Sequence, residues 1–256
     1  MKLKNKIVLI TGASAGIGLA CAQLFASEGA KLILAARREK SLKEIADDLK
    51  SKYGTDSYLM ALDVRDRKLC EKAISEIPES FKSVDILINN AGLARGLGKI
   101  QDGDFNDWDE MIDTNIKGLL TFTRLIVPVM IQKGDGMIIN MASVAGREVY
   151  PGGNIYCTTK SAVKTISRAL QIDLNGTGVR VCNIDPGMVE TEFSMVRFKG
   201  DTERAKKVYE GWTPLTAMDV AETCLFCATR PKHVSIHDIA IMATDQASTY
   251  IINRKQ

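Results

Sequence analysis

Short, continuously apolar runs alternate with longer stretches of mixed polarity along the whole chain. The short runs are rich in Val, Ile and Leu, as buried strands are, and they predict strands at residues 6–11, 31–36, 57–62, 85–89, 136–141, 180–185 and 238–243. The longer stretches carry apolar residues at helical spacing and predict helices at residues 16–28, 41–52, 67–77, 105–133, 154–175, 202–209 and 218–229. Because strands alternate with helices, we expect right-handed crossovers and a parallel sheet with helices on both faces.

The alternation continues to the end of the sequence without a break that would separate two domains. Neither a Pro-, Gly- or Ser-rich linker nor a repeat of about 20 to 50 residues interrupts it. We predict an α/β fold with one doubly wound domain of about seven strands over residues 1–256, and a loop with a short helix inserted at residues 190–211. Ligands bind such sheets beyond the carboxyl ends of the strands, so the residues after each strand are the candidates for a site.

The composition is that of an ordinary globular protein, with 256 residues, 45% hydrophobic and 25% charged, and a formal net charge of +3. So small a positive surplus argues against binding to nucleic acid. The first residues lack the apolar run of a secretion signal, and the longest later apolar stretch, residues 125–131, is too short to cross a membrane. We expect a cytoplasmic protein whose six scattered cysteines are reduced thiols.

A glycine-rich turn, Thr-Gly-Ala-Ser-Ala-Gly-Ile-Gly, follows the first predicted strand. Glycine permits a tight bend there and lets a pyrophosphate approach the backbone N–H groups at the start of the next helix. The turn therefore predicts a dinucleotide site that involves Gly12, Ser14, Gly16, Ile17 and Gly18.

The same turn also fits the Gly-x-Ser-x-Gly pattern of serine hydrolases, with Ser14 as the nucleophile. That fold needs strands and an oxyanion loop ahead of the serine, whereas only 13 residues precede Ser14. It also needs a catalytic His after a later acid, and the two histidines, His233 and His237, lie by a predicted loop and the start of the last predicted strand. Hydrolysis is the weaker of the two hypotheses.

Two arginines, Arg37 and Arg38, follow the second predicted strand. An acidic residue at this place would hydrogen-bond the ribose 2′-hydroxyl of NAD, whereas arginine pairs with the 2′-phosphate of NADP. Because the acid is absent, the sequence favours NADP.

A Tyr and a Lys, Tyr156 and Lys160, lie four residues apart near the start of a predicted helix. This spacing puts both side chains on one helix face, where an ammonium can lower the pKa of the phenol and allow proton transfer near neutral pH. Ser143 follows the fifth predicted strand and can donate a hydrogen bond to a substrate oxygen. Each signal is weak alone, because exposed helices carry such pairs and serines often form turns.

Taken together and in this order, the motifs resemble the short-chain dehydrogenase/reductase family over almost the whole chain. The matching segments are Thr11-Gly12-x3-Gly16-x-Gly18, Asp63-Val64, Asn89-Asn90-Ala91-Gly92, Asn115, Ser143, Tyr156-x3-Lys160 and Pro186-Gly187-Met188-Val189-Glu190-Thr191. The resemblance implies a single-domain Rossmann-type oxidoreductase with Tyr156 as the catalytic acid/base. It further implies that Lys160 holds the nicotinamide ribose and lowers the Tyr pKa, that Ser143 orients the carbonyl, and that Asn115 holds a water of a proton relay.

The resemblance also implies the cofactor contacts. Asp63 and Val64 meet the adenine, and Asn90 lies along the cofactor. Val189 and Thr191 hold the nicotinamide carboxamide, in the segment that begins with Pro186 and Gly187.

Residues 143–160, 190–201 and 244–248 resemble the NADP-dependent 3-hydroxy acid dehydrogenases of that family, also described as serine or L-allo-threonine dehydrogenases. The C-terminal region lacks the Asp-Gly-Gly that a 3-oxoacyl thioester reductase of the family carries. This finer resemblance implies a short 3-hydroxy acid substrate such as serine, allo-threonine or 3-hydroxypropionate. Arg147 and Arg197 are the candidates to bind its carboxylate, since arginine pairs bidentately with carboxylates. A broad-specificity carbonyl reductase and a non-catalytic NADP-binding sensor remain the alternatives.

Two further patterns concern metals and assembly. Cys224 and Cys227 have the spacing of metal ligands, but they lack a second pair and lie in an apolar helix, so we expect buried thiols and no metal site.

The long predicted helices at 105–133 and 154–175 carry more apolar residues than one face needs. The family resemblance implies that the second face packs in a homotetramer.

Overall fold

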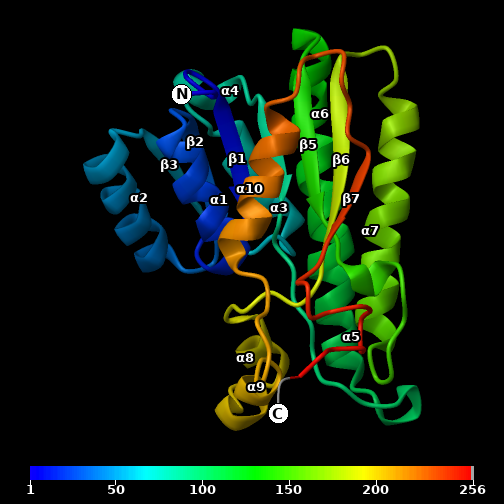
Figure 1. Ribbon diagram of the computed structural model, residues 1–256. Coiled ribbons are helices and arrows are strands. Elements are labelled where there is room, and N and C mark those ends of the chain that lie inside the picture. The colour runs from blue at the N-terminus through cyan, green and yellow to red at the C-terminus, as the bar shows by residue number, and fades with distance from the viewer. Residues whose placement is uncertain (255–256) are drawn as a thin grey trace.

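The computed structural model describes residues 1–254, and its centre is one parallel sheet in the order β3-β2-β1-β4-β5-β6-β7 (Figure 1). The strands are β1 (Ile7–Thr11), β2 (Lys31–Ala36), β3 (Ser57–Ala61), β4 (Ile86–Asn89), β5 (Gly136–Met141), β6 (Val179–Pro186) and β7 (Asp238–Ile241). The chain order reverses between β1 and β4, which is the switch point of a doubly wound sheet. The predicted fold class is confirmed; the predicted domain's last two residues, Lys255 and Gln256, lie outside the described residues.

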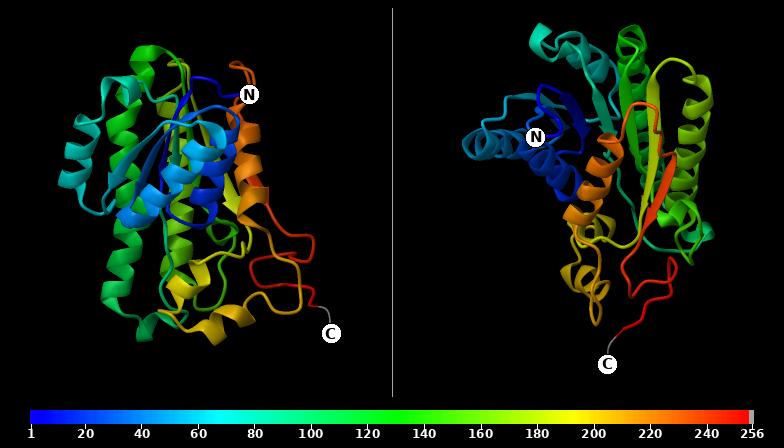
Figure 2. Two further views of the ribbon diagram at one scale, coloured as in Figure 1. Left: turned by 90° about the vertical axis from the view of Figure 1, so that its left-hand side faces the viewer. Right: turned by 45° about the horizontal axis from the view of Figure 1, so that its top comes forward.

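Helices cover both faces of the sheet. They are α1 (Gly16–Ser27), α2 (Glu39–Tyr53), α3 (Arg67–Ser75), α4 (Glu79–Lys82), α5 (Phe105–Ile112), α6 (Leu119–Lys133), α7 (Asn154–Asp173), α8 (Phe193–Arg197), α9 (Thr202–Lys207) and α10 (Ala217–Ala228). One core lies under α1, α2 and α10, and the other lies under α3, α6 and α7 (Figures 1 and 2). Alternate residues of β1 point into the two cores, Val8 and Ile10 into the first and Ile7 and Leu9 into the second.

The predicted helix at residues 105–133 is interrupted. Between α5 and α6 the turns widen into a π-helical segment, Asp113–Gly118, of the kind that often marks a functional site. A Cβ on Gly118 would lie 2.7 Å from the Val64 side chain, so this close approach to the loop after β3 requires a glycine.

By length and composition alone, the helical stretch Phe105–Lys133 passes as a membrane span, with a mean hydropathy of 1.2 in its most apolar window. Phe122, Ile126 and Met130 of this stretch are buried against the sheet. Packing on the sheet therefore accounts for the apolar residues on one face of the stretch.

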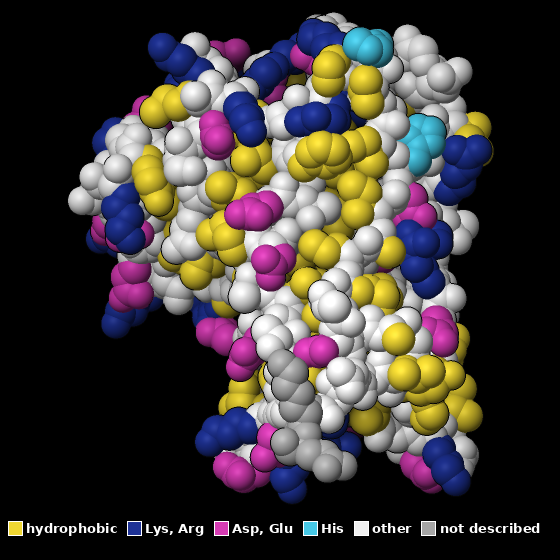
Figure 3. All heavy atoms as spheres, viewed as in Figure 1, with side chains coloured by type: hydrophobic (Ala, Val, Ile, Leu, Met, Phe, Trp, Pro, Cys, Tyr) yellow, Lys and Arg dark blue, Asp and Glu magenta, His cyan; other side chains and the backbone are white. Residues whose placement is uncertain are grey.

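The inserted segment forms α8 and α9, which project beyond the carboxyl ends of the strands beside the C-terminal residues (Figures 1 and 2). Charged side chains of both signs gather on this projection in the space-filling view (Figure 3). Arg254 ties the C-terminal residues to it, since its guanidinium donates to the Val208 carbonyl at 3.2 Å.

The thiols of Cys224 and Cys227 are buried in the first core, as expected for a core helix. The Cys227 sulfur lies 3.6 Å from that of Cys182 on β6.

Candidate active site

A cavity of about 690 Å³ opens at the carboxyl ends of the strands, where the sequence predicts the site. Its walls include most of the predicted site residues, namely Gly12, Ser14, Gly16, Ile17, Arg37, Arg38, Asp63, Val64, Asn90, Ser143, Tyr156, Lys160, Pro186, Gly187, Val189, Thr191 and Arg197. Gly18, Asn115 and Arg147 are not among the lining residues, and each has another place in the structure.

The glycine-rich turn has the backbone that only glycine adopts readily. Gly12 and Gly16 have φ values of +67° and +52°, in the left-handed region. A Cβ on Gly18 would lie 2.3 Å from the Gly12 carbonyl oxygen, so this glycine allows α1 to pack closely on the turn. The Asn90 side chain donates to the carbonyls of Thr11 and Gly12 at 3.0 and 3.3 Å and braces the turn from β4.

The start of α1 is suited to an anion. Its N-cap residue is Ala15, which has no side chain able to cap the first N–H groups, and these groups lie at the cavity wall formed by Gly16 and Ile17. A free helix N-terminus in a glycine turn binds phosphate through its N–H groups and its dipole. The turn therefore fits the pyrophosphate of a dinucleotide.

Arg37 and Arg38 lie beside that turn. The Arg38 guanidinium donates to the hydroxyl and the carbonyl of Ser14, at 3.2 and 3.0 Å, and pairs with Glu192 at 3.0 Å. Arg37 lies 4.0 Å from Asp63, and about half of each arginine side chain is exposed. Both cations thus remain accessible at the cavity wall, after the second strand, where the sequence predicts the 2′-phosphate of NADP.

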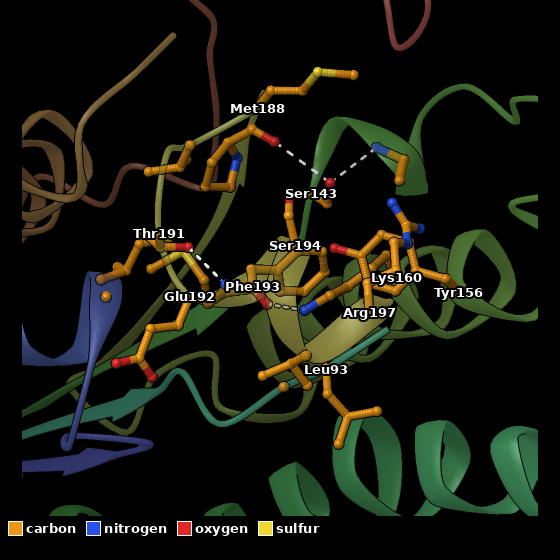
Figure 4. A pocket seen from close by; sticks show the side chains of 18 of the residues that line it. Leu93, Ser143, Tyr156, Lys160, Met188, Thr191, Glu192, Phe193, Ser194 and Arg197 are labelled. Atoms are coloured by element: carbon orange, nitrogen blue, oxygen red, sulfur yellow. Dashed lines mark hydrogen bonds between the residues drawn. The ribbon is translucent and has the colours of Figure 1, made fainter. Parts of the chain in front are cut away.

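Tyr156 and Lys160 lie on the first turns of α7, and Ser143 follows β5, so these two segments meet at one end of the cavity (Figure 4). The Lys160 Nζ donates to the Met141 carbonyl at 2.8 Å, which holds the buried ammonium against the end of β5. The Ser143 hydroxyl accepts from the Ala145 N–H at 3.1 Å and donates to the Pro186 carbonyl at 3.4 Å.

The pKa values of this group depend most on burial. Burial raises the pKa of the Tyr156 phenol above its ordinary value, against the lowering effects of the Arg197 guanidinium and the Ser143 hydroxyl. Burial also lowers the pKa of Lys160 to about 8, with Asp185 opposing it. We predicted a phenol pKa lowered by Lys160. That lowering stays a prediction: burial is the largest influence on this pKa, and the Lys160 Nζ lies 5.9 Å from the centroid of the Tyr156 ring.

Asn115 lies in the π-helical turn, buried behind the cavity. Its side-chain amide donates to the Leu93 carbonyl at 2.9 Å and to the Thr159 hydroxyl at 3.0 Å, and its oxygen accepts from the Leu93 N–H at 2.9 Å. Asn115 thus joins the loop after β4 to α7 directly beside Lys160. The relay water assigned to it by the resemblance stays a prediction.

Arg147 does not face the cavity, and the prediction that it binds a substrate carboxylate is wrong. Its guanidinium forms ion pairs of 2.5 Å with both Asp185 and Asp238. The 3₁₀ turn Val144–Gly146 carries the side chain back toward β6 and β7, where the carboxylate of Asp185 is fully buried and needs a cation.

Arg197, at the end of α8, does face the cavity. Its guanidinium carbon lies 5.1 Å from the centroid of the Tyr156 ring and 5.5 Å from that of Tyr150, and the group donates to the Tyr150 hydroxyl. The buried Arg197 Nε has no hydrogen-bond partner among residues 1–254. A cation therefore lies next to Tyr156 at the wall of the cavity (Figure 4).

Sequence reasoning missed Tyr150, Phe193 and Gln246, which also line the cavity. The Gln246 side chain accepts from the Met188 N–H at 2.9 Å and donates to the Ser248 carbonyl at 3.0 Å, so it fixes the segment after β6. Tyr150 lies between Ser143 and Tyr156 in sequence, and that position is the one signal that could have identified it.

The sequence matches the short chain dehydrogenase family over residues 6–202. The chain belongs to this family. It is 44% identical over 256 residues to the NADP-dependent 3-hydroxy acid dehydrogenase of Schizosaccharomyces pombe, covering 100% of this chain and 99% of the relative. It is 46% identical over 252 residues to sulfoacetaldehyde reductase 2 of Chromohalobacter salexigens, covering 98% and 99%.

The dehydrogenase also resembles a solved structure, the closed form of serine dehydrogenase complexed with NADP+. The TM-score is 0.91 at 42% identity, with 98% of this chain and 100% of the other covered. The fold and the order of the site residues thus agree with a family of oxidoreductases.

Proposed function

We propose that this dehydrogenase transfers a hydride between NADP(H) and the hydroxyl-bearing carbon of a short 3-hydroxy acid such as serine, allo-threonine or 3-hydroxypropionate. The observation that carries the proposal is Arg197, a half-buried cation that lines the cavity with its guanidinium carbon 5.1 Å from the centroid of the Tyr156 ring. A carboxylate there would receive charge-assisted hydrogen bonds. The names of the relatives, a 3-hydroxy acid dehydrogenase and a serine dehydrogenase, support the same substrate class.

NADP+, when bound, supplies the acceptor of the hydride. The glycine turn and the start of α1 would hold its pyrophosphate, Arg37 and Arg38 its 2′-phosphate, and Asp63 and Val64 its adenine. Asn90, Pro186 and Gly187 would line its path, and Val189 and Thr191 would hold the carboxamide. These assignments rest on the cavity walls that the residues form.

Side chains of this protein transfer the proton and position the substrate and the cofactor. In the oxidative direction Tyr156 acts as the phenolate, the form that the Arg197 guanidinium and the Ser143 hydroxyl favour against burial. It takes the hydroxyl proton while the hydride passes from the hydroxyl-bearing carbon to the cofactor. Ser143 donates to the substrate oxygen, Lys160 holds the cofactor ribose, and Arg197 keeps the carboxylate at a fixed distance from the reacting carbon. Binding energy at the remote carboxylate then orients the reacting centre.

The double variant Arg37→Ala/Arg38→Ala should bind NADP at least about ten times more weakly and NAD almost unchanged, because each lost charge-assisted hydrogen bond is worth roughly 1.5 to 3 kcal/mol. Titration of both cofactors by fluorescence measures this. Lys40→Ala, a charge removed from a side chain that is 91% exposed in the same segment, is the matched control. Equal weakening of NADP and NAD would mean that the arginines only support the loop.

A second candidate substrate is a short hydroxy sulfonate. The relative named sulfoacetaldehyde reductase favours it, and a sulfonate presents to Arg197 a single negative charge like that of a carboxylate. The two candidates differ in headgroup geometry, with three oxygens in place of two.

A substrate panel read by NADPH absorbance tests the proposal. It contains 3-hydroxypropionate, L-serine, L-allo-threonine, 2-hydroxyethanesulfonate and methyl 3-hydroxypropionate. We expect the anions to have a higher kcat/KM than the neutral ester, and the 3-hydroxy acids to exceed the sulfonate. Equal rates for acid and ester would make the protein a broad-specificity carbonyl reductase, and NADP binding without turnover of any compound would make it a sensor.

We further propose a cytoplasmic homotetramer with residues 190–211 as its substrate loop. The six cysteines support the compartment, because all are free and buried thiols. Exposed apolar side chains on two helices support assembly, with Phe105 of α5 74% exposed and Ile172 of α7 62% exposed.

A further inference from the structure

The short helix α8 is held from outside the cavity by a pair of charged residues. Arg95, in the loop after β4, donates through Nη1 to the carbonyl of Val196 at 2.6 Å. The other edge of the same guanidinium binds Glu110 of α5, with Nε 2.5 Å and Nη2 3.2 Å from the two carboxylate oxygens. One planar side chain thus connects α5 to the residue that precedes Arg197.

Further contacts fix the same stretch. The Gly96 N–H donates to the Arg197 carbonyl at 3.1 Å. The Lys199 Nζ lies 2.9 Å from the carboxylate of Asp107, one turn before Glu110 on α5. The backbone of α8 is therefore bound on both sides of Arg197 by the loop after β4 and by α5.

The Arg95–Glu110 pair is better placed to persist than the pairs on the surface. Both side chains are only 18% exposed, and their contact is the bidentate fork that arginine and carboxylate favour. Arg95 holds the pKa of Glu110 below its usual value, with Arg65 as a further cation 3.5 Å away. The lowered pKa favours the charged carboxylate of Glu110 and with it the ion pair.

A helix as short as α8 does not hold its own conformation. It spans five residues, Phe193–Arg197, fewer than the number at which helices become stable by themselves. Its position must come from tertiary contacts. The Arg95 and Gly96 contacts hold the backbone of α8 at the place from which the Arg197 guanidinium reaches Tyr156.

We propose that Arg95 and Glu110 are positioning residues for substrate recognition: they fix α8 so that Arg197 points at the anionic group of the substrate next to Tyr156. Neither residue lines the cavity, so both act through Val196 and Arg197. The proposal rests on the proposed role of Arg197 as the substrate's anion partner. The new element is that the Arg95–Glu110 ion pair, which lies outside the cavity, sets the position of Arg197.

The variants Glu110→Gln and Arg95→Met should raise KM for 3-hydroxypropionate about tenfold with a much smaller change in kcat, because displacement of a positioned cation weakens orientation of the acid. The kinetics of the uncharged methyl 3-hydroxypropionate should stay close to those of the parent. Arg95→Lys keeps an ion pair with Glu110, so its KM for 3-hydroxypropionate should rise less than that of Arg95→Met. Asp109→Asn, an exposed acid on the same helix, is the matched control for the loss of one charge.

Limited digestion with trypsin gives a reading that is independent of substrate. The segment after Arg197 offers exposed cleavage sites at Lys199, Arg204 and Lys206. In Glu110→Gln and Arg95→Met, cleavage there should be several times faster than in the parent and in Asp109→Asn, while the thermal midpoint of the whole protein stays similar.

The outcomes separate the two proposals. Should Arg197→Met leave the acid-to-ester ratio of the parent unchanged, the anion site fails, and faster cleavage in the Arg95 and Glu110 variants still reports their hold on α8. The positioning role is wrong if Arg197→Met lowers the acid-to-ester ratio of kcat/KM while the Arg95 and Glu110 variants retain the parent KM and cleavage rate. An equal loss for acid and ester in those variants would also overturn it, since that pattern indicates general damage to the fold.

Discussion

Replacement of Tyr156 by Phe is expected to lower turnover of the hydroxy acid at least about a hundredfold, the low end of what general acid/base catalysis supplies. The variant loses one hydroxyl and keeps the aromatic ring that packs at 5.6 Å, centroid to centroid, against Phe193. The cofactor walls are unchanged, so NADPH should bind with close to the parent affinity. Turnover measured by NADPH absorbance and binding measured by NADPH fluorescence give the two readings.

Tyr250→Phe is the matched control for this experiment. Tyr250 also lines the cavity, but it is 57% exposed and its hydroxyl is not part of the Ser143–Tyr156–Lys160 group. The control should keep most of the turnover. Near-normal turnover by Tyr156→Phe would remove the phenol from the mechanism, and a parallel loss of NADPH binding would assign Tyr156 to the cofactor site instead.

The parallel sheet could be predicted because its strands carry their own signal. A strand buried on both faces is mostly apolar, and the five residues of β1 are all buried, four of them apolar. Predicted strand ends differ from the observed ones by small amounts, as for residues 238–243 against Asp238–Ile241. The helix α8 escaped prediction, since five residues do not make a helical period and tertiary contacts hold them.

The places of the glycine turn and of the Tyr156–Lys160 pair could also be predicted, because a strand-to-helix turn and the spacing of one helix set them locally. The roles of the two substrate arginines could not. Arg147 and Arg197 are equally plausible in sequence, and the difference is that Arg147 meets the buried Asp185 and the distant Asp238, whereas Arg197 meets aromatic rings. Such partners come from strands and helices far along the chain.

The π-helical turn at Asn115 could not be predicted either, because it too depends on partners far along the chain. The Asn115 amide forms hydrogen bonds with Leu93 and Thr159, which lie 22 and 44 residues away in the sequence. The wider turn of the helix thus makes contacts between separate segments. The pKa of Tyr156 likewise depends on burial and on Arg197, neither of which the Tyr-x3-Lys spacing contains.

Replacement of Arg197 by Met is expected to lower kcat/KM for 3-hydroxypropionate by about a hundredfold, because roughly 1.5 to 3 kcal/mol is lost with each charge-assisted hydrogen bond to the carboxylate. The ratio of acid to methyl ester should fall by nearly the same factor, since the ester has no charge to lose. Met keeps much of the apolar length of the side chain against Tyr150 and Phe193. Initial rates over a range of both substrates measure the ratio.

Arg147→Met is the matched control for Arg197→Met, with the same substitution at the arginine that is paired with acids. It leaves the buried Asp185 without its cation, so the thermal midpoint should fall, whereas the ratio of acid to ester should stay the same. Arg197→Met has a second signature in the pH profile of ester oxidation. The Arg197 guanidinium lowers the pKa of Tyr156, so its removal raises that pKa, leaves less phenolate at a given pH, and moves the rise of the rate to higher pH. If Arg197→Met changes neither the acid-to-ester ratio of kcat/KM nor the pH profile of ester oxidation, Arg197 does not bind the substrate carboxylate. A broad-specificity carbonyl reductase is then the better interpretation.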